Sequence, residues 1–454
     1  MTRIAIIGAG ITGVTTASSL MDRGYDVTLF DRNRYAAMQT SFANGGQLSA
    51  SNAETWNRWS TVIKGMKWMM TRGAPLLVNP KPSWHKYSWM AEFVAAIPQH
   101  RANTVETTRM AIAARGLLTE KAERHGFDFD CENRGILHIY TKKSEFDHAT
   151  EVNKLLSEGG LERRAVAPEE VRQIEPALRG EFYGGYYTES DFTGDIHRYT
   201  TGLAKSIEAG GAVLRFGTDV DVLKVDKNEV RLTWSRNNES QTETFDAIVV
   251  CAGVESRTIA AELGDRVNVY PVKGYSITVC LDDEESQRAA PWISLLDDET
   301  KVVTSRLGKD RFRIAGTAEF NGYNLDIRDD RIRPLVKWCE QFFPDVSTEH
   351  AVPWAGLRPM MPNMMPRIGQ GVRDRVFYNT GHGHLGWTLS AVTAEMVAEK
   401  VMASGTVNAS FSASRVTEEL KLFVRPRGNY RFNSYTLTAS DGSDSTVVAT
   451  RSDL

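Results

Sequence analysis

Two histidines stand between glycines in residues 379–387 (NTGHGHLGW). Histidine pairs can hold a metal ion or act as general bases, but no third His, Cys, Asp or Glu accompanies His382 and His384 at ligand spacing. We therefore predict no metal site. The glycines instead let the backbone approach a planar ring, and a helix expected from Leu385 onward would present its N-terminal amides to negative charge. The pattern favours a cofactor-contacting loop, and a histidine base remains an open alternative.

A single arginine, Arg358, lies in the otherwise apolar residues 354–361 (WAGLRPMM). A guanidinium keeps its charge when it is buried, so it needs an anion as its partner. That anion is either an acidic side chain of the protein or the carboxylate of a bound ligand. From the residues alone, both interpretations stay open.

The N-terminal residues carry a nucleotide-binding pattern. Residues 3–8 (RIAIIG) are a short apolar run typical of a buried strand, and residues 14–23 have the pattern of a helix. Between them lie residues 8–13 (GAGITG), and a second predicted strand, residues 26–31, ends in Asp31. In this arrangement the helix N-terminus faces a pyrophosphate and the carboxylate accepts hydrogen bonds from a ribose. Asp31 would repel a 2′-phosphate, so the sequence predicts a dinucleotide without one.

The order of the later elements distinguishes FAD from NAD. Strand and helix signals of the same kind resume only at residues 195–216 and 245–253. An NAD-binding domain normally continues its sheet directly, whereas a flavoprotein can carry its substrate domain as an insertion. The other glycine pairs lack the flanking strand, the spacing and the acid of a second fingerprint. We therefore expect FAD and no second nucleotide.

The composition is that of an ordinary folded protein, with 41% hydrophobic and 24% charged residues among 454. Lys and Arg number 54 against 57 Asp and Glu, so the charge gives no reason to expect nucleic acid as a partner. Four separated cysteines indicate neither a zinc cluster nor a disulfide framework. The first strand begins at residue 3, which leaves no room for a signal peptide, and no apolar run of about 18 residues could cross a bilayer. We expect a cytoplasmic protein.

Six blocks of the chain together resemble the D-amino-acid oxidase superfamily of FAD enzymes, most closely the bacterial D-amino-acid dehydrogenases (small subunit) and the glycine oxidases. The blocks are residues 8–13 with Asp31, residues 40–47 (TSFANGGQ), residues 193–195 (TGD), residues 271–277 (PVKGYSI), residues 354–359 (WAGLRP) and residues 379–387. The resemblance runs from about residue 3 to about residue 404.

The resemblance implies an α/β fold with a Rossmann-like FAD-binding domain of the glutathione-reductase type. Into it is inserted an α+β substrate domain built on a mixed or antiparallel sheet. The expected ranges are 1–50, 190–265 and 355–404 for the discontinuous FAD-binding domain, and 51–189 and 266–354 for the substrate domain. Residues 405–454 are expected to be a C-terminal extension, to which we assign no role.

The resemblance also implies the site residues, with FAD bound non-covalently. The expected cofactor contacts are Gly8, Gly10, Ile11, Thr12, Gly13, Asp31, Arg32, Ser41, Asn44, Gly45, Gly46, Gln47, Ala252, Gly253, Gly383, His384, Leu385, Gly386 and Trp387. Arg358 is expected to clamp the substrate carboxylate, and either His382 or His384 can face the substrate. Tyr275 is a further catalytic candidate that could bond the substrate, although a tyrosine packed at a domain edge explains the pattern equally well. We expect its neighbour Lys273 to be a solvated charge.

The activity that the resemblance implies is oxidative deamination of an amino acid, most closely a D-amino acid. Such enzymes pass the α-hydrogen as a hydride to flavin N5, and water then hydrolyses the imine to a keto acid and ammonia. An oxidase of glycine, sarcosine or another N-substituted amino acid is the alternative, since a carboxylate clamp serves all of them. A flavin-binding assembly protein without turnover is the alternative from another class.

A tryptophan-rich insert follows the first domain segment. Its tryptophans, half of the ten in the chain, are Trp56, Trp59, Trp68, Trp84 and Trp89. Basic residues lie among them, and this combination is typical of a surface that touches lipid headgroups. The alternative is a cap on the substrate cavity, because cavities are also lined by Trp and Met. Related dehydrogenases are peripheral at the inner face of the membrane and use quinone, whereas related oxidases use oxygen; we expect one of these two acceptors.

Overall fold

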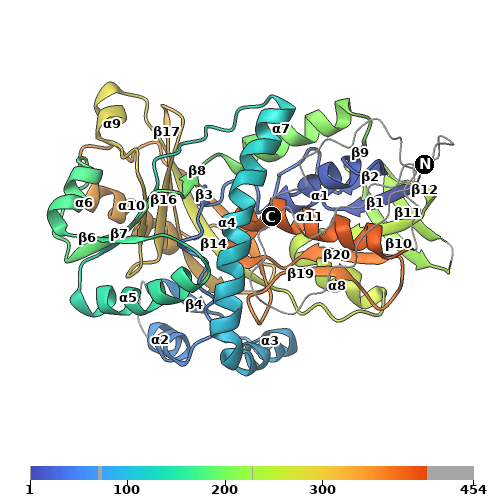
Figure 1. Ribbon diagram of the computed structural model, residues 1–454, viewed down its shortest axis with the longest axis horizontal. Coiled ribbons are helices and arrows are strands. Elements are labelled where there is room, and N and C mark those ends of the chain that lie inside the picture. The colour runs from blue at the N-terminus through green and yellow to red at the C-terminus, as the bar shows by residue number, and fades with distance from the viewer. Residues whose placement is uncertain (1, 70–73, 228, 406–454) are drawn as a thin grey trace, which may run out of the picture. The chain divides into compact units, whose positions relative to one another are not determined.

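The computed structural model of the chain describes residues 2–69, 74–227 and 229–405 (Figure 1). The expected C-terminal extension, residues 405–454, therefore lies outside the described residues from residue 406 onward.

A six-stranded sheet contains the N-terminal strand, in the order β19-β20-β13-β1-β2-β9. Its strands are β1 (Arg3–Ile7), β2 (Asp26–Asp31), β9 (Val213–Phe216), β13 (Ala247–Val250), β19 (Arg367–Gln370) and β20 (Val376–Thr380). All neighbours are parallel except the pair β19 and β20. Parallel strands buried on both faces read as continuous apolar runs, which is why the runs in β1 and β13 predicted strands at these places.

The six-stranded sheet is covered on both faces. Alternate side chains of a strand point to opposite faces, and Ile4 and Ile6 pack among helices while Ala5 and Ile7 pack toward a small second sheet. The helices are α1 (Ile11–Met21), α7 (Ile196–Ala209) and α11 (Gly386–Ala403). The small sheet consists of β10 (Asp219–Val225), β11 (Val230–Arg236) and β12 (Glu239–Phe245), beside η2 (Gly253–Glu255) and α8 (Ser256–Glu262).

The second large sheet has nine strands and is mixed, as expected for the substrate domain. Its path is β18-β14-β17-β16-β15-β5-β7-β6, and β4 also pairs with β17. The strands are β4 (Leu76–Val78), β5 (Ile136–Tyr140), β6 (Arg164–Val166), β7 (Gly184–Thr188), β14 (Tyr270–Cys280), β15 (Ser294–Asp297), β16 (Val302–Leu307), β17 (Arg311–Phe320) and β18 (Val352–Met360). The expected domain boundary at residue 355 falls inside β18, and the domain ranges otherwise stay a prediction.

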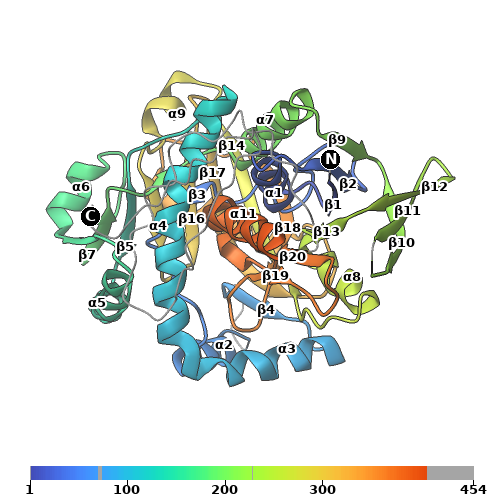
Figure 2. The ribbon, with the colours of Figure 1, turned by 45° about the vertical axis from the view of Figure 1, so that its right-hand side comes forward.

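Helices surround the nine-stranded sheet and connect it to the first. They are α2 (Trp59–Met69), α3 (Trp84–Ala95), α4 (His100–His125), α5 (Lys143–Glu158), α6 (Pro168–Ile174), α9 (Glu284–Ala289) and α10 (Asp329–Phe342), with the short η1 (Ile97–Gln99). The long helix α4 contacts α11 and α5 (Figures 1 and 2). A two-stranded link, β3 (Gln47–Leu48) with β8 (Phe192–Thr193), joins the predicted flavin loop to the segment before α7.

A β-bulge interrupts the pairing of β14 with β17. Lys273 pairs with Glu319, but Tyr275 pairs with Gly316, so two residues of β17 stand opposite one residue of β14. One of the two is Thr317, whose φ of 60° lies in the left-handed region. A β-branched residue there costs roughly 1–3 kcal/mol, and such strain is concentrated at functional sites.

Candidate active site

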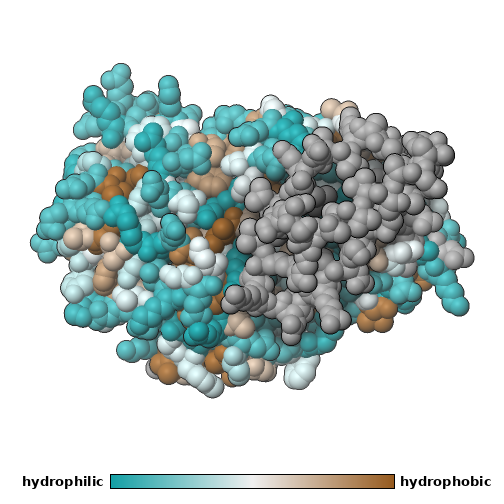
Figure 3. All heavy atoms as spheres, in the orientation of Figure 1, coloured by the Kyte–Doolittle hydropathy of each residue, from teal (hydrophilic) through white to brown (hydrophobic). Residues whose placement is uncertain are grey.

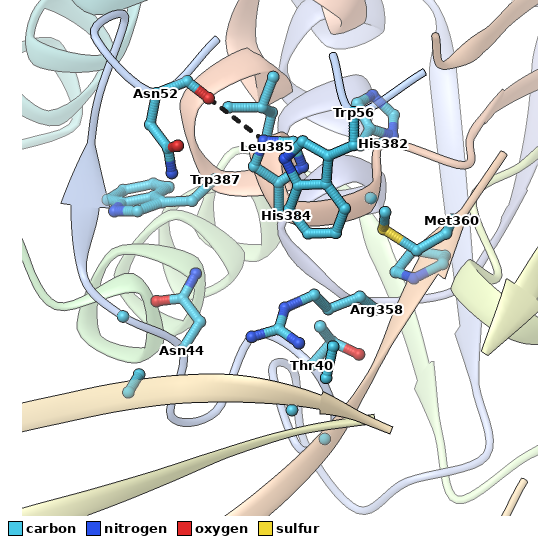
Figure 4. A pocket seen from close by; sticks show the side chains of 18 of the residues that line it. Thr40, Asn44, Asn52, Trp56, Arg358, Met360, His382, His384, Leu385 and Trp387 are labelled. Atoms are coloured by element: carbon cyan, nitrogen blue, oxygen red, sulfur yellow. Dashed lines mark hydrogen bonds between the residues drawn. The ribbon is translucent and has the colours of Figure 1, made fainter. Parts of the chain in front are cut away.

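One cavity of about 1000 Å³ brings the predicted residues together. It is lined by all the expected cofactor contacts except Gly13, and by the four candidate catalytic residues. The volume is at the upper end of the range for small-molecule sites, so it leaves room for a large cofactor and a smaller substrate. Figure 4 shows the guanidinium of Arg358 pointing into an open space bordered by Asn44, Trp387 and His384.

The glycine-rich turn lies at one end of this cavity. Gly8 has a φ of 106°, and Gly13 lies so close to the Gly8 carbonyl that no side chain fits there. Gly13 therefore supports helix-on-strand packing and lies outside the cavity lining. Asp31 fixes the turn, because its Oδ2 accepts the Ala9 N–H (2.7 Å). Oδ1 accepts the backbone N–H and the side-chain amide of Asn33, but Oδ2 keeps a second lone pair that can accept a ribose hydroxyl.

The loop of residues 40–47 connects the turn to the nine-stranded sheet. Ser41 Oγ accepts the N–H of Ile11, the first residue of α1 (3.0 Å), and Gln47 Nε2 donates to Ser294 Oγ on β15 (2.8 Å). Asn44 Oδ1 accepts the Gly46 N–H (2.9 Å) and closes the loop on itself. These bonds fix the loop in the cavity lining.

The histidine loop leads into α11 through η3 (Gly383–Leu385). Gly383 has a φ of 61°, and a side chain on it would collide with Met360. The positive φ favours glycine at this position, and the bare backbone leaves room for a ring beside it. Trp387 lines the cavity, and its buried Nε1 has no hydrogen-bond partner among the described residues.

Both histidines are neutral at pH 7. Burial lowers the pKa of His382 to about 3, and its Nε2 lies 2.9 Å from Thr393 Oγ1 on α11. Burial also lowers the pKa of His384 to about 4, and the nearby Arg358 lowers it further. The Nε2 of His384 donates to the Asn52 carbonyl (3.2 Å), and its ring stacks on Trp56 at 4.6 Å. His384 thus forms a fixed, uncharged wall of the cavity.

Arg358 is a buried cation that makes no ion pair with the described residues. Burial lowers the pKa of its guanidinium to about 10, so it stays charged at pH 7. Nη1 donates to the Thr317 carbonyl (3.0 Å), and no acidic side chain of the described residues lies within ion-pairing distance. Of the two interpretations, the described contacts therefore support an anion supplied by a ligand.

Two further residues, Gly274 and Thr317, shape the position of Arg358, and neither was among the predicted site residues. The guanidinium packs against Gly274 on β14, where a Cβ would overlap it. The bulge at Thr317 turns the carbonyl that accepts from Arg358 Nη1 toward the cavity. A strand glycine in PVKGYSI signals a close approach, but the identity of the approaching group depends on the pairing of β14 with β18.

Lys273 and Tyr275 belong to a buried ionic cluster. Our expectation that Lys273 is a solvated charge is wrong, because its side chain is 0% exposed and pairs with Glu319 at 3.2 Å. The Tyr275 hydroxyl donates to the other Glu319 oxygen (2.6 Å), which supports a structural role for this tyrosine. Burial, followed by Glu319, raises the pKa of Tyr275. The sequence did contain one signal for this pair: an acidic residue, Glu319, lies in the otherwise largely apolar end of β17, and Lys273 lies in an apolar part of β14.

The tryptophan-rich insert contributes to both cavity and surface. Trp56, Trp68 and Trp89 line the cavity, so the predicted cap is present. Trp59 and Trp84 are exposed, by 61% and 81%, on α2 and α3. The two readings of this insert therefore apply to different tryptophans.

The residues present fit FAD. The glycine turn, the N-terminus of α1 and Asp31 suit the pyrophosphate and the ribose, and the two loops flank a space wide enough for a ring. Trp387 Nε1 and His384 Nδ1 are buried polar atoms without partners among the described residues, and bound groups could satisfy them.

Comparison with known proteins gives the same answer. Residues 3–400 match the model of the DAO family, described as FAD dependent oxidoreductase. The chain is 60% identical over 414 residues to "D-amino acid dehydrogenase 3" of Mesorhizobium japonicum, which covers 91% of this chain and 100% of that protein. It is 39% identical over 408 residues to "D-amino acid dehydrogenase" of Dechloromonas aromatica, covering 88% and 96%.

Solved structures share the fold at low identity. The crystal structure of glycine oxidase from Geobacillus kaustophilus has a TM-score of 0.67 at 21% identity and covers 88% of this chain and 95% of that one. That of L-proline dehydrogenase from P. horikoshii has a TM-score of 0.68 at 17% identity, covering 88% and 93%. At such identity these similarities show the arrangement of the two sheets and not the substrate.

Proposed function

Because the chain belongs to the DAO family of FAD-dependent oxidoreductases, we propose that it removes two electrons from the Cα–N bond of a D-amino acid. The family and the mixed α/β fold expected from the six blocks are confirmed. The product would be an imino acid, which water hydrolyses to a keto acid and ammonia.

A single observation carries this proposal: the buried cation of Arg358 lines the cavity and has no acidic partner in the part of the chain that the structure describes. A charged guanidinium presents a planar fork that fits a carboxylate at two points. One arm of this fork is fixed by the Thr317 carbonyl, which orients the other donors toward the open space. An α-amino acid supplies the missing anion one bond from the carbon to be oxidised.

Bound FAD would supply the two-electron acceptor for the α-hydrogen. The residues that would hold it are the glycine turn with Asp31, the loop of residues 40–47, Ala252 with Gly253, and the loop of residues 383–387. The protein's own contribution is orientation. Arg358 would hold the substrate carboxylate, and the neutral His384, stacked on Trp56, would form a wall beside the substrate. The α-carbon then has few possible orientations. Alignment of this kind supplies much of an enzymatic rate.

The D-amino acid reading is favoured over a glycine or sarcosine oxidase. The relative that is 60% identical over its whole length is named as a D-amino acid dehydrogenase, whereas glycine oxidase is similar in fold alone. The test is to add D-amino acids, L-amino acids, glycine and sarcosine separately and anaerobically to the FAD-loaded protein. Reduction of the flavin by D-amino acids alone supports the proposal, and reduction by glycine or sarcosine alone contradicts it.

The proposed electron acceptor is a membrane quinone. No helix in the described ranges is long and apolar enough to cross a membrane. On α2, the exposed residues Trp59, Ile63 and Met66 follow one another at helical spacing, with Lys64 beside them. Such an apolar stripe with basic neighbours fits a lipid surface.

The face formed by α2 and α3 continues this stripe. Trp84 and Tyr87 of α3 are also exposed, and both ribbon views place α2 and α3 next to each other (Figures 1 and 2). Figure 3 shows hydrophobic side chains along the lower edge, where these helices lie. Flotation with anionic vesicles tests the membrane contact. The acceptor is tested by measuring turnover with a quinone and with oxygen: oxygen uptake as fast as quinone reduction would argue for oxygen.

A further inference from the structure

A second cation lies beyond Arg358 along the same wall of the cavity. From β18, the Arg358 side chain crosses β14 and reaches the Thr317 carbonyl on β17. The next strand is β16, where Val303 pairs with Ala315, so Lys301 comes opposite Thr317 just beyond the end of this ladder. The guanidinium itself lies over Gly274 on β14, two strands from β16, and neighbouring strands are about 4.8 Å apart, so the guanidinium and the backbone of Lys301 are roughly 10 Å apart.

Lys301 occupies an unusual position for a lysine. It ends the four-residue turn between β15 and β16 with a φ of 56°, a conformation that glycine or asparagine adopts at less cost. Its Nζ contacts Asp298 Oδ1 at 2.8 Å, and both side chains line the cavity. A strained residue whose charged group faces the cavity suggests that the side chain itself is needed.

The turn that carries Lys301 is rigid. Asp297 Oδ1 accepts the backbone N–H of both Glu299 and Thr300, and its Oδ2 accepts from the Thr300 hydroxyl and from Trp338 Nε1. These four bonds preorganise the turn, so a ligand that binds Lys301 does not have to order it.

Two acidic side chains near Lys301, Asp298 and Glu54, already have other partners. Asp298 accepts the Tyr140 hydroxyl as well as Lys301, and Glu54 pairs with Arg58 and His100. Burial, followed by the neighbouring Glu299, raises the pKa of Glu145. The Lys301 ammonium has three N–H groups and donates one of them to Asp298. The other two can donate to a ligand.

We propose that Lys301, held by Asp298, binds the end of the substrate side chain and selects amino acids whose side chain ends in a carboxylate or carboxamide. This inference rests on the proposed function, because it needs the α-carboxylate on Arg358. A substrate whose two polar ends are separated by two or three methylene groups, with a hydrogen bond of about 3 Å at each end, spans roughly 10 Å and so can reach from one cation toward the other. An apolar side chain of the same length would offer no acceptor to the two ammonium N–H groups that Asp298 does not take.

The experiment compares D-glutamine and D-glutamate with D-norleucine, an apolar amino acid of similar length, by the rate of anaerobic flavin reduction in the FAD-loaded protein. We expect kcat/KM for either polar substrate to exceed that for D-norleucine by at least about tenfold. Lys301→Met should remove most of this ratio by raising KM for the polar substrates, while D-norleucine is unaffected. Lys309→Met, at an exposed lysine on the next turn, is the matched control and should change neither value.

A second variant separates selectivity from folding. Lys301→Gly removes the ammonium and also relieves the positive φ, so it should lose the ratio while Tm is unchanged or raised. A ratio that Lys301→Met leaves intact overturns the inference, and so does a preference of the natural protein for D-arginine or D-lysine. In both cases reduction by D-norleucine would leave the proposed function standing. Failure of every amino acid to reduce the flavin would instead remove the proposed function, and the inference with it.

Discussion

The guanidinium of Arg358 packs against the backbone of Gly274 on the neighbouring strand. Arg358 itself pairs with Val272, and Gly274 pairs with Gly356, so the side chain leans diagonally across β14. From there it reaches the Thr317 carbonyl at the bulge. The position of the guanidinium is thus set by the absence of a side chain at Gly274 on β14 and by the extra residue of the bulge on β17.

Adding a methyl group at residue 274 should displace the charge without removing it. A Cβ there would overlap the guanidinium, so Gly274→Ala is expected to raise KM for the amino acid about tenfold or more, in the range of a lost charged hydrogen bond. Steady-state kinetics with the preferred D-amino acid measures this. The matched control is Gly116→Ala on α4, where a Cβ meets nothing within 4 Å and should leave KM unchanged. An unchanged KM in Gly274→Ala would mean that Arg358 does not need its observed position.

The Tyr275 hydroxyl should matter for stability and not for substrate binding. Its hydrogen bond goes to Glu319, whose other oxygen contacts Lys273. Tyr275→Phe is therefore expected to lower the free energy of unfolding by about 1.5–3 kcal/mol, the range for hydrogen bonds to charged groups, with KM within about threefold. Denaturation of the FAD-loaded protein and kinetics on the same sample provide both values. A tenfold loss of kcat/KM at unchanged stability would return Tyr275 to the catalytic residues.

The fingerprint and the histidine loop could be predicted because their chemistry is local. Glycine spacing, a short apolar run and a terminal acid are contiguous in sequence, and the expected strand of residues 26–31 is β2. The expected helix of residues 14–23 begins earlier, at Ile11, because Gly10 is its N-cap. Arg358 was visible as a charge in an apolar segment.

The surroundings of Arg358 could not be predicted, because they depend on register between distant strands. The bulge opposite Gly274 shifts the pairing of β14 with β17 and thereby selects Thr317 as the acceptor. The burial of Lys273 depends on the same pairing, which places Glu319 beside it. The sequence of β14 alone does not reveal which strand pairs with it, so Lys273 was expected to be exposed to solvent.

The buried histidines should make the protein less stable in mild acid. The pKa of His382 is about 3 in the folded chain against 6.5 for an ordinary histidine, so between these values the unfolded chain binds a proton that the folded chain does not. The free energy of unfolding therefore falls as pH drops below 6.5, by up to about 1.4 kcal/mol per pH unit for each such histidine. Tm between pH 7.5 and 5 measures the effect.

The contribution of His382 can be isolated by replacement. His382→Gln removes the titrating group, so its Tm should depend less steeply on pH than that of the natural protein. His350→Gln, at an exposed histidine, should leave the slope as it was. Equal slopes in all three proteins would show that His382 does not stay neutral through burial.

Charge on the α2 stripe should weaken contact with vesicles. Each large apolar side chain buried in the lipid interface contributes about 1.5–3 kcal/mol, so Trp59→Glu with Ile63→Glu is expected to lower vesicle binding at least tenfold. Flotation of the FAD-loaded protein with anionic vesicles provides the measurement. Val372→Glu, at an exposed apolar residue outside α2 and α3, is the control. Binding that both proteins retain would place the membrane contact elsewhere.

The measurement that tests the central proposal most directly is anaerobic flavin reduction in Arg358→Ala. If Arg358 holds the substrate carboxylate, the variant should bind FAD normally, because the residue reaches toward Thr317 and not toward the glycine turn. The D-amino acid concentration that half-saturates reduction should rise at least tenfold, and Arg358→Lys should recover only part of the loss because it lacks the two-point fork. Reduction at the concentration that the natural protein requires would contradict the proposed clamp.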